Sequence, residues 1–337
     1  MQRSFRKRSR GIGRDEAFIF DVITILLIFP ILLRYLPNEF LLSFEWLSGN
    51  QVARFGFAIA LIIVSVIDRK RGRKRASMMA FIPVMIVIIE AFWYIPIVHF
   101  HQNVPSDRKM RIVTMNTATA SRTGLVERIA ADNADVFCLQ EVYVEKLDKL
   151  FADAKARGYE GRFATLRDDA GMGTAIFSRF PILSTDTLTT SSWKEMERRF
   201  LAVLIDVNGQ RVRVICVQLE STKRNEQLWG VIESWKLRMQ QARLIQETVE
   251  GTYHPVVVAG DLNSTPTNRA LRPLKTILTD SWRVAGVGLG ATWPRNFPFL
   301  RIDAILYHGF IGAANTARFK AAYSDHLAYG VDLILPE

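Results

Sequence analysis

The chain has 337 residues, of which 49% are hydrophobic and 23% are charged, with 44 Lys and Arg against 33 Asp and Glu. This composition excludes a disordered chain, because it supplies enough apolar side chains to bury a core. Two cysteines, Cys138 and Cys216, exclude a disulfide-rich scaffold and a zinc cluster built from cysteine pairs. The length indicates about two units of roughly 100–200 residues each.

The positive charge is distributed unevenly along the chain. Residues 1–100 hold 14 Lys and Arg against 7 Asp and Glu, which leaves 30 against 26 for residues 101–337. Most of the basic excess therefore belongs to the N-terminal part, and the remainder of the chain lacks the strong positive charge that a nucleic-acid groove requires.

Three apolar stretches predict an α-helical transmembrane region within residues 1–100, at about 18–36, 52–67 and 76–100. A span needs about 20 apolar residues, so the third is long enough, the first is adequate and the second is short. Glu90 lies inside the third stretch, and we interpret it as snorkelling or pairing with another helix residue such as Arg54 rather than as a substrate contact. The polar residues 101–110 predict a linker to a domain at 111–337.

Basic residues flank these stretches asymmetrically. They precede the first stretch and separate the second from the third, whereas residues 37–51 contain neither Lys nor Arg. Positive charge near span ends stays in the cytoplasm, so three spans predict an integral protein of a bacterial cell membrane with a cytoplasmic N-terminus and an extracytoplasmic domain. If the second stretch does not span, the orientation inverts. A cleavable signal peptide is the alternative for the first stretch, but no small-x-small cleavage site follows it.

Beyond the linker, short apolar runs alternate with helical patterns, which is typical of a single layered α/β domain. Helices are expected at 125–131, 144–156 and 226–249. Strands are expected at 111–115, 135–139, 173–178, 200–207, 211–217, 255–259, 302–307 and 327–333.

Polar side chains interrupt or follow these strands, where α/β folds build their sites because strand ends meet at one rim of a sheet. Any one of them alone would more readily be explained as a turn or cap residue. Together they form a candidate constellation of carboxylates, amides and one imidazole: Asn116, Gln140, Glu141, Asp261, Asn263, Asp303, Ser324, Asp325 and His326.

The residue types in this constellation narrow the chemistry. Oxygen donors without cysteine or clustered histidine favour a hard cation, Mg²⁺ or Mn²⁺, over zinc. A hard cation beside a His–Asp pair suits phosphate-ester hydrolysis, in which the cation neutralises phosphoryl charge and a positioned base prepares water. The sequence has no GxSxG, GxxxxGK[ST] or HExxH motif, so the reaction classes that use those motifs lack their residues.

These residues lie in blocks that together resemble the endonuclease/exonuclease/phosphatase superfamily. The blocks are Asn116 after a strand, LQEV at 139–142, GTAIFSRFPI at 173–182, AGDLNSTP at 259–266, RIDAIL at 301–306 and SDH at 324–326, all in order. The layout of the whole chain is similar to three-span bacterial members of that superfamily. The resemblance implies a four-layer α/β sandwich, in which two packed mixed β-sheets are flanked by helices.

The resemblance also implies a metal site and residues that bind the substrate. Glu141 would be the principal Mg²⁺ (or Mn²⁺) ligand, with Asn116 beside it and Asp325 contributing from the SDH block. Gln218 and Arg301 would bind the substrate.

Proton transfer would fall to a second set of residues. Asp261 would activate or orient the attacking water, and Asn263 would hold both Asp261 and the phosphate. His326 would contact the phosphate and share the acid–base work, oriented by Asp303. A carboxylate on one imidazole nitrogen fixes the tautomer and supports the charged form, which is an independent reason for that pairing.

Gln218 departs from the family pattern, which commonly has His in a THL-like block at this place. Glutamine still donates a hydrogen bond to a phosphoryl oxygen but cannot act as a cation or a general acid. Cys138 and Cys216 lie inside apolar strands, which favours buried thiols, although an extracytoplasmic location would permit a disulfide. Trp193, Arg198 and Arg199 precede a predicted strand and are candidates for a substrate edge, although we prefer to interpret the two arginines as covering a solvated face.

Three functions remain open at this point. The preferred one is a membrane-anchored, Mg²⁺-dependent phosphoesterase whose partners are the lipid bilayer and a lipid- or envelope-linked phosphate ester. The second is an extracytoplasmic nuclease, against which the weak charge balance counts. The third is a catalytically weak phosphate-binding module, motivated by Gln218 but disfavoured by the full proton-transfer set.

Overall fold

The computed structural model describes residues 63, 85, 88, 108–118, 124–168, 171–192, 196–222, 227–321 and 324–336. Apart from the three isolated positions, the expected spans at 18–36, 52–67 and 76–100 lie outside the described residues, as does the expected linker up to residue 107. Among the described residues, no helix is both long enough and apolar enough to cross a membrane.

Two six-stranded mixed sheets form the centre of the domain. The first sheet has the order β11 (Gly312–Phe319), β12 (Ala328–Ile334), β1 (Lys109–Asn116), β2 (Val136–Tyr143), β4 (Met172–Ser178), β3 (Glu160–Thr165). The second has the order β5 (Ile182–Ser191), β6 (Glu197–Val207), β7 (Gln210–Gln218), β8 (Val256–Asp261), β10 (Asp303–His308), β9 (Thr279–Asp280). Parallel pairing joins β1 to β2 and β7 to β8, and the other pairs are antiparallel.

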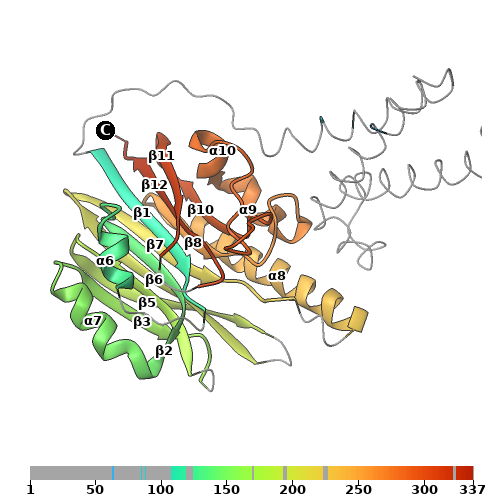
Figure 1. Cartoon of the computed structure of the whole chain (residues 1–337), viewed down its shortest axis with the longest axis horizontal. Helices are drawn as coiled ribbons and strands as arrows, with labels where there is room; N and C mark the ends of the chain where they lie inside the picture. Colours follow the sequence, from blue (N-terminus) through green and yellow to red (C-terminus); the bar gives the residue numbers. More distant parts are fainter. Residues whose placement is uncertain are drawn as a thin grey trace, which may run out of the picture. The chain divides into compact units, whose positions relative to one another are not determined.

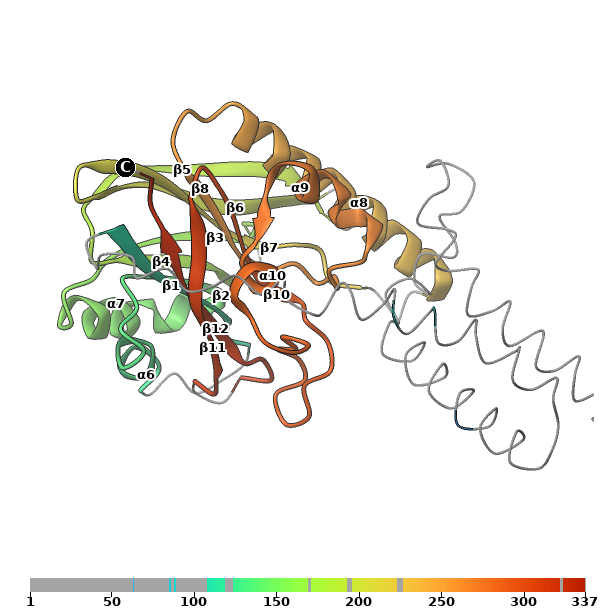
Figure 2. The same ribbon diagram turned by 90° about the horizontal axis from the view of Figure 1, so that it is seen from above.

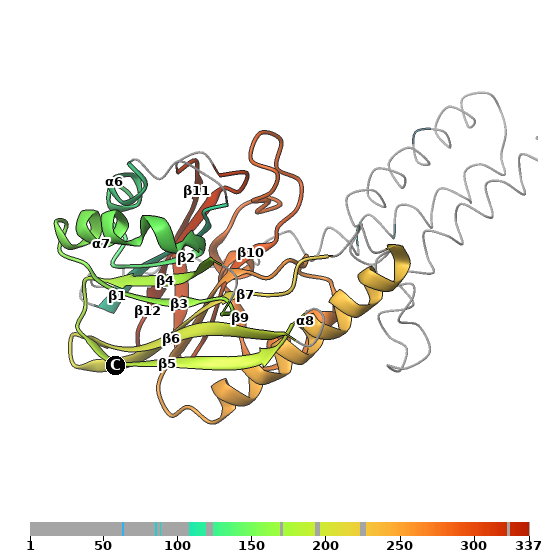
Figure 3. The same ribbon diagram turned by 90° about the horizontal axis from the view of Figure 1, so that it is seen from below.

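Helices cover the two outer faces of this sheet pair. Figure 1 shows the whole arrangement, and Figures 2 and 3 show α6 (Leu125–Ala130) and α7 (Leu147–Lys155) on one side and the long α8 (Gln227–Glu250) on the other. A 3₁₀ turn at Val144–Lys146 leads into α7, and another at Arg269–Leu271 leads into α9 (Arg272–Ile277) beside α8. The short α10 (Ser281–Ala285) follows β9. The architecture is therefore the expected α/β sandwich of two sheets between helical layers.

Three apolar clusters fill the spaces between the layers. One lies between the sheets, one between the first sheet and α6 and α7, and one between the second sheet and α8 and α9. The sequence of strand β8 is continuously apolar because both of its faces are covered. Val257 and Ala259 face the other sheet, while Val256 and Val258 face the helices. A strand that is covered on both faces loses the alternation of polar and apolar residues.

The two cysteines belong to the cluster between the sheets. Cys138 on β2 and Cys216 on β7 are both buried and free, so the expectation of buried thiols is confirmed and the disulfide alternative is wrong. Burial raises the pKa of the Cys138 thiol well above its usual range, with the neighbouring Cys216 acting in the same direction.

Candidate functional site

Three strand ends of the second sheet place polar side chains in a row. Gln218, the last residue of β7, is paired in register with Asp261, the last residue of β8, which in turn faces Asp303, the first residue of β10. Residues opposite each other in a sheet point to the same face. The polar residues at the ends of these three apolar strands therefore lie next to one another on one face of the sheet.

The first sheet contributes Asn116 and Glu141 to the same place. Asn116 ends β1, and Glu141 lies in β2 where the pairing with β4 shifts between Leu139 and Val142. Glu141 has a φ of 54°, a conformation that few non-glycine residues adopt. The irregularity lets Gln140 stay in the buried interior while the next side chain, Glu141, lines a cleft.

Amide donors hold the carboxylate of Glu141 and connect the two sheets. Asn116 Nδ2 donates to Glu141 Oε1 at 3.0 Å and to Asp261 Oδ2 at 3.1 Å. Gln218 Nε2 donates to the same Glu141 Oε1 at 2.7 Å. Gln218, which was expected to donate to the phosphate, therefore donates to a carboxylate in this structure. Asn116, which was expected beside the cation, presents its amide nitrogen rather than its oxygen to Glu141 and Asp261.

Asp261 is fixed by the turn that follows β8. Asn263, with a φ of 47°, donates its backbone N–H to Asp261 Oδ1 at 2.8 Å and its Nδ2 to Asp261 Oδ2 at 3.2 Å. Nδ2 of Asn263 also donates to the carbonyl of Leu219 at 2.9 Å. Burial and, to a smaller extent, the neighbouring carboxylate of Asp303 raise the pKa of Asp261 to about 7, against the opposing effect of His326. Asp261 is thus poised as a base near neutral pH.

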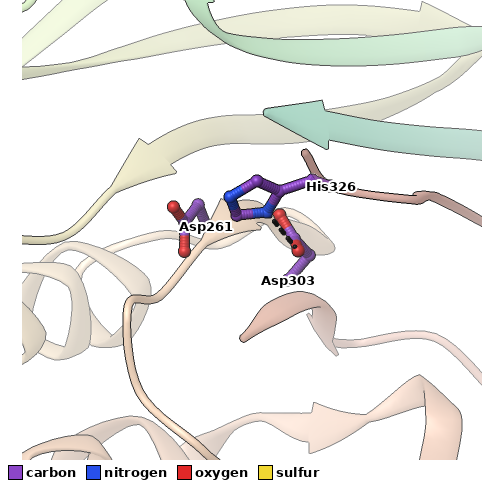
Figure 4. Close-up of side chains that lie close together, drawn as sticks. All are labelled: Asp261, Asp303 and His326. Carbon is purple, nitrogen blue, oxygen red and sulfur yellow. Dashed lines mark hydrogen bonds and ion pairs between the residues drawn. The ribbon is translucent and has the colours of Figure 1, made fainter. Parts of the chain in front are cut away.

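A histidine–aspartate pair lies beside Asp261, as Figure 4 shows. His326 Nδ1 is 2.8 Å from Asp303 Oδ2, and both side chains are buried. Burial lowers the pKa of His326, but Asp303 and the carboxylates of Asp261 and Asp325 outweigh it and raise the pKa to about 10. The hydrogen bond to Asp303 at Nδ1 fixes the orientation of the ring.

The loop before β12 is tied to β1, which sets the position of His326. Ser324 Oγ donates to the carbonyl of Asn116 at 2.6 Å and accepts the backbone N–H of His326 at 2.9 Å. Asp325 is the more exposed member of this block, and its Oδ2 accepts from Trp293 Nε1 at 2.9 Å. The SDH block therefore aims His326 inward and Asp325 toward the mouth of the cleft.

The donors fit a cation. Ligand atoms of Asp261, Asp303 and His326 lie within 4.8 Å of one another and form a candidate metal site. Glu141 is joined to this group through Asn116. Two buried aspartates and a nearby glutamate concentrate negative charge, and the raised pKa of Asp261 shows that positive charge is needed to keep the carboxylates ionised. A hard, oxygen-preferring cation supplies that charge.

The site opens into a cleft of about 330 Å³. Its lining includes residues that the sequence analysis did not assign to the site, among them Trp293, which lies in the loop before β10, and Arg198, which lies near the start of β6. Its full lining is Asn116, Glu141, Arg198, Gln218, Leu219, Ser221, Thr222, Asp261, Asn263, Trp293, Leu300, Ile302, Asp325 and His326.

Arg198 is the clearest correction to the sequence interpretation. It is buried rather than solvated, donates Nη1 to the carbonyl of Gln218 at 2.7 Å, and pairs Nη2 with Glu220 Oε2 at 3.2 Å. Arg199 faces the other way and pairs with Asp168 and Glu197 at 2.6 and 2.9 Å. The alternation along β6 gives the signal that could have separated these two arginines.

Arg301 is the one expected substrate-binding residue that the structure does not bring into the cleft. Its Nη1 pairs with Asp280 at 2.9 Å, and it lines a separate apolar cavity of about 340 Å³. Arg301 precedes the first residue of β10, so the strand alternation that aims Asp303 into the site does not extend to it. Ile302 lies in the wall of both cavities.

A paired-sheet α/β sandwich with carboxylates, amides and a His–Asp pair at its strand ends defines a hydrolase site of the acid–base type. The family model described as "Endonuclease/Exonuclease/phosphatase family" matches residues 113–326. The chain belongs to this family and is a hydrolase of phosphoric ester bonds.

Solved structures agree with this assignment at the level of the fold. Truncated TDP2 of Caenorhabditis elegans is 18% identical with a TM-score of 0.53, and the match covers 67% of this chain and 97% of that chain. The mannosyl-6-phosphatase of Bacteroides thetaiotaomicron VPI-5482 is 19% identical with a TM-score of 0.54, covering 67% of this chain and all of the other. Curated proteins gave no match.

Proposed function

We propose that the protein is a membrane-anchored, Mg²⁺-dependent (or Mn²⁺-dependent) phosphoesterase that acts on a lipid- or envelope-linked phosphate ester at the outer face of the membrane. The observation that carries the proposal is the convergence of Glu141, Asp261 and His326 in one cleft, with the buried Asp303 lying 2.8 Å from His326 Nδ1. The name of one solved neighbour, a phosphatase, is in keeping with a phosphate ester as substrate.

Each polar residue has a role in this proposal. Glu141 would hold the cation together with Asp325, and Asn116 belongs to this set through its contact with Glu141. The bound cation supplies neutralisation of phosphoryl charge. Asp261, held by Asn263, accepts a proton from the attacking water, and a pKa of about 7 suits that role.

His326 is placed for the opposite proton movement. Its Nδ1 is held by Asp303, which leaves Nε2 as the donor toward a phosphoryl or leaving-group oxygen. As the ester bond breaks, the leaving oxygen takes this proton while water supplies the new oxygen on phosphorus. Asp303 preserves the ring orientation throughout.

The membrane location rests on sequence alone. Three apolar stretches and the basic residues around them favour a cytoplasmic N-terminus and an extracytoplasmic domain. A reporter that is fluorescent only in the cytoplasm, fused after Glu337, tests the orientation. No signal is expected, and a strong signal would overturn both the topology and the outward-facing substrate.

The activity is tested with purified full-length protein in detergent, in Mg²⁺ and in EDTA. The substrates are bis-p-nitrophenyl phosphate, single-stranded and duplex DNA, a phospholipid and a polyprenyl pyrophosphate, and Asp261→Ala serves as the blank. Metal-dependent turnover of a lipid substrate, lost in the blank, is expected. Turnover of DNA alone would instead establish the nuclease, and no turnover by protein that binds Mn²⁺ would establish the binding module.

A further inference from the structure

A short hairpin forms one wall of the cleft. Residues 293–300 lie in the loop between α10 and β10, which extends from the body of the domain (Figures 2 and 3). Trp293 and Leu300 exchange backbone hydrogen bonds of 3.0 and 2.8 Å, and the N–H of Phe299 donates to the Trp293 carbonyl at 3.0 Å. These bonds close the segment into a hairpin whose base is the Trp293–Leu300 pair.

The two ends of this hairpin face different surroundings. Its base residues Trp293 and Leu300 line the cleft that contains the candidate catalytic groups. Toward the tip, Phe297 is 78% exposed and Phe299 is 36% exposed. The Trp293 and Phe299 rings are in edge contact, with centroids 6.2 Å apart. Apolar surface therefore runs from the cleft to the exposed end of the hairpin.

Hydrogen bonds fasten the hairpin to the loop before β12, which carries His326. The backbone N–H of Arg295 donates to the Asp325 carbonyl at 2.6 Å, and Trp293 Nε1 donates to Asp325 Oδ2 at 2.9 Å. The Leu327 N–H also donates to the Thr292 carbonyl at 2.8 Å. These bonds fix the exposed rings relative to His326. Phe299 packs against the Trp293 ring while Phe297 stays mostly in water, and exposed apolar surface of this kind on a fixed support marks a binding surface.

The charge around the hairpin distinguishes between classes of ligand. Arg295 is the only basic residue in 286–300, and its Nη1 is directed to the Ser324 carbonyl at 3.4 Å. Binding of nucleic acid needs several phosphate contacts from Lys or Arg. An apolar ligand needs no such contacts. The apolar stretches in residues 1–100 indicate that this protein lies next to a lipid bilayer.

We propose that the hairpin at residues 293–300 binds the hydrocarbon chain of an amphiphilic phosphate ester, while the phosphate of the same molecule lies among the groups around His326. The inference rests on the proposed phosphoesterase function and assigns its substrate class: a lipid phosphate taken from a bilayer or micelle surface. Phe297 and Phe299 contact the chain, and Trp293 marks the boundary between chain and phosphate.

The test compares two esters that share the reacting centre and differ only in the chain: ethyl p-nitrophenyl phosphate and hexadecyl p-nitrophenyl phosphate in mixed micelles. Full-length protein and the variant Phe297→Ser/Phe299→Ser are assayed with both. Because two apolar contacts are removed, the ratio of kcat/KM for the hexadecyl ester to that for the ethyl ester is expected to fall about tenfold or more. An unchanged ratio would overturn the proposal.

A matched control and a second substrate sharpen the result. Tyr253→Ser removes a fully exposed aromatic ring far in sequence from the hairpin and leaves the ratio unchanged. A single-stranded oligonucleotide is assayed in parallel, because exposed aromatic rings also stack on bases. If the double variant loses oligonucleotide cleavage with no change in the ester ratio, the hairpin binds bases and the lipid assignment is wrong.

The outcome for the hairpin is separable from that for catalysis. If the wild-type protein hydrolyses neither ester in Mg²⁺, the phosphoesterase proposal fails, and the hairpin is then assessed by binding of hexadecylphosphonate. The double variant is expected to bind it about tenfold more weakly than wild type, whereas Tyr253→Ser binds it equally well. Equal binding by all three proteins would overturn the hairpin proposal on its own.

Discussion

Gln218 donates its amide N–H to Glu141 Oε1 at 2.7 Å, across the gap between the two sheets. The resemblance to the family implied a phosphate contact for this residue, but the structure assigns it to the carboxylate expected to hold the cation. The residue in place of the usual histidine therefore orients, from the facing sheet, the carboxylate that we propose as a metal ligand.

Replacement of Gln218 by Leu is expected to weaken metal binding. The variant removes one of two amide donors to Glu141, and loss of such an outer partner typically costs about 10–100-fold in metal affinity. The Mg²⁺ concentration that gives half-maximal activity should rise by about that factor. Gln240→Leu, on the exposed face of α8, serves as the control. An unchanged Mg²⁺ requirement would show that the hydrogen bond does not tune the cation site.

Gln218→His separates the metal-orienting role from a substrate-binding role. Because Gln218 is engaged with Glu141, introducing the histidine common in the family is expected to give no gain in kcat. A gain of tenfold or more, measured at saturating Mg²⁺, would instead place this position in contact with the phosphoryl group.

Removal of the metal or of its principal carboxylate should abolish turnover. EDTA is expected to reduce activity to the level of the blank, with recovery on addition of excess Mg²⁺ or Mn²⁺. Glu141→Gln keeps the size of the side chain but removes its charge, and should lower kcat/KM by at least about 100-fold. Glu145→Gln changes an exposed carboxylate nearby in sequence and should leave kcat/KM unaltered. Persistent activity in Glu141→Gln would relocate the metal to the Asp261–Asp303–His326 group.

Asp303→Asn should damage the rate more than substrate binding. Without the carboxylate 2.8 Å from Nδ1, the imidazole of His326 loses the partner that fixes its tautomer. A loss of roughly 10³–10⁴-fold in kcat is expected, with a much smaller change in KM. Steady-state kinetics on bis-p-nitrophenyl phosphate measures both parameters. If kcat stayed unchanged and the whole loss of kcat/KM came from a higher KM, Asp303 would serve substrate binding rather than proton transfer.

The metal-free protein should lose stability as the pH rises. The pKa of Asp261 is raised to about 7, so its contribution is complete below its ordinary pKa near 4 and is lost as the pH rises through 7. The pKa of His326 is raised to about 10, so its contribution is complete below about pH 6.5 and is lost as the pH rises through 10. The melting temperature in EDTA should therefore fall between about pH 5 and pH 9.

Asp261→Asn is the variant that checks this assignment. Because asparagine does not titrate, the fall in melting temperature between about pH 5 and pH 7 should become shallower. A variant whose melting temperature follows that of the wild type in parallel across this range would show that another group causes the dependence.

Two neighbouring arginines on β6 should differ greatly in their effect on stability. Arg198→Met removes the guanidinium that lies 3.2 Å from the buried Glu220 carboxylate, and breaking a buried ion pair typically costs about 3–5 kcal/mol. At about 2–4 °C per kcal/mol for a domain of this size, the melting temperature should fall by at least about 6 °C. Arg199→Met breaks pairs with exposed carboxylates and should leave the melting temperature nearly unchanged. Similar losses in both variants would contradict the buried role of Arg198.

The strands that were predicted from sequence are the interior strands of the two sheets. Each is covered on both faces, as β8 is with Val256 to Ala259, so each appears as an apolar run. The four strands that escaped prediction, β3, β5, β9 and β11, are the four sheet edges. Strand β5, ILSTDTLTTS, is polar and mostly exposed, as edge strands commonly are, and carries no apolar pattern to detect.

The site was predictable where polar residues end apolar strands, as at Asp261 and Asp303. It was not predictable where the residue lies inside a strand or in an irregular loop. Arg198 needed the alternation of β6 to be known, and Trp293 needed the course of the loop before β10. Arg301 shows the reverse error, because a residue two positions from a site residue was assigned to the site before the strand boundary was known.

The order in which the strands enter the sheets has a consequence for biosynthesis. Strand β12 pairs with β1, so that Lys109 faces Ile334, although the entire second sheet lies between them in sequence. A growing chain thus exposes the edge of β1 until the C-terminal strand arrives, and the same segment brings His326. A chain terminated before residue 324 would combine an open sheet edge with a cleft that lacks its acid–base histidine, so incomplete translation products should be inactive and prone to aggregation.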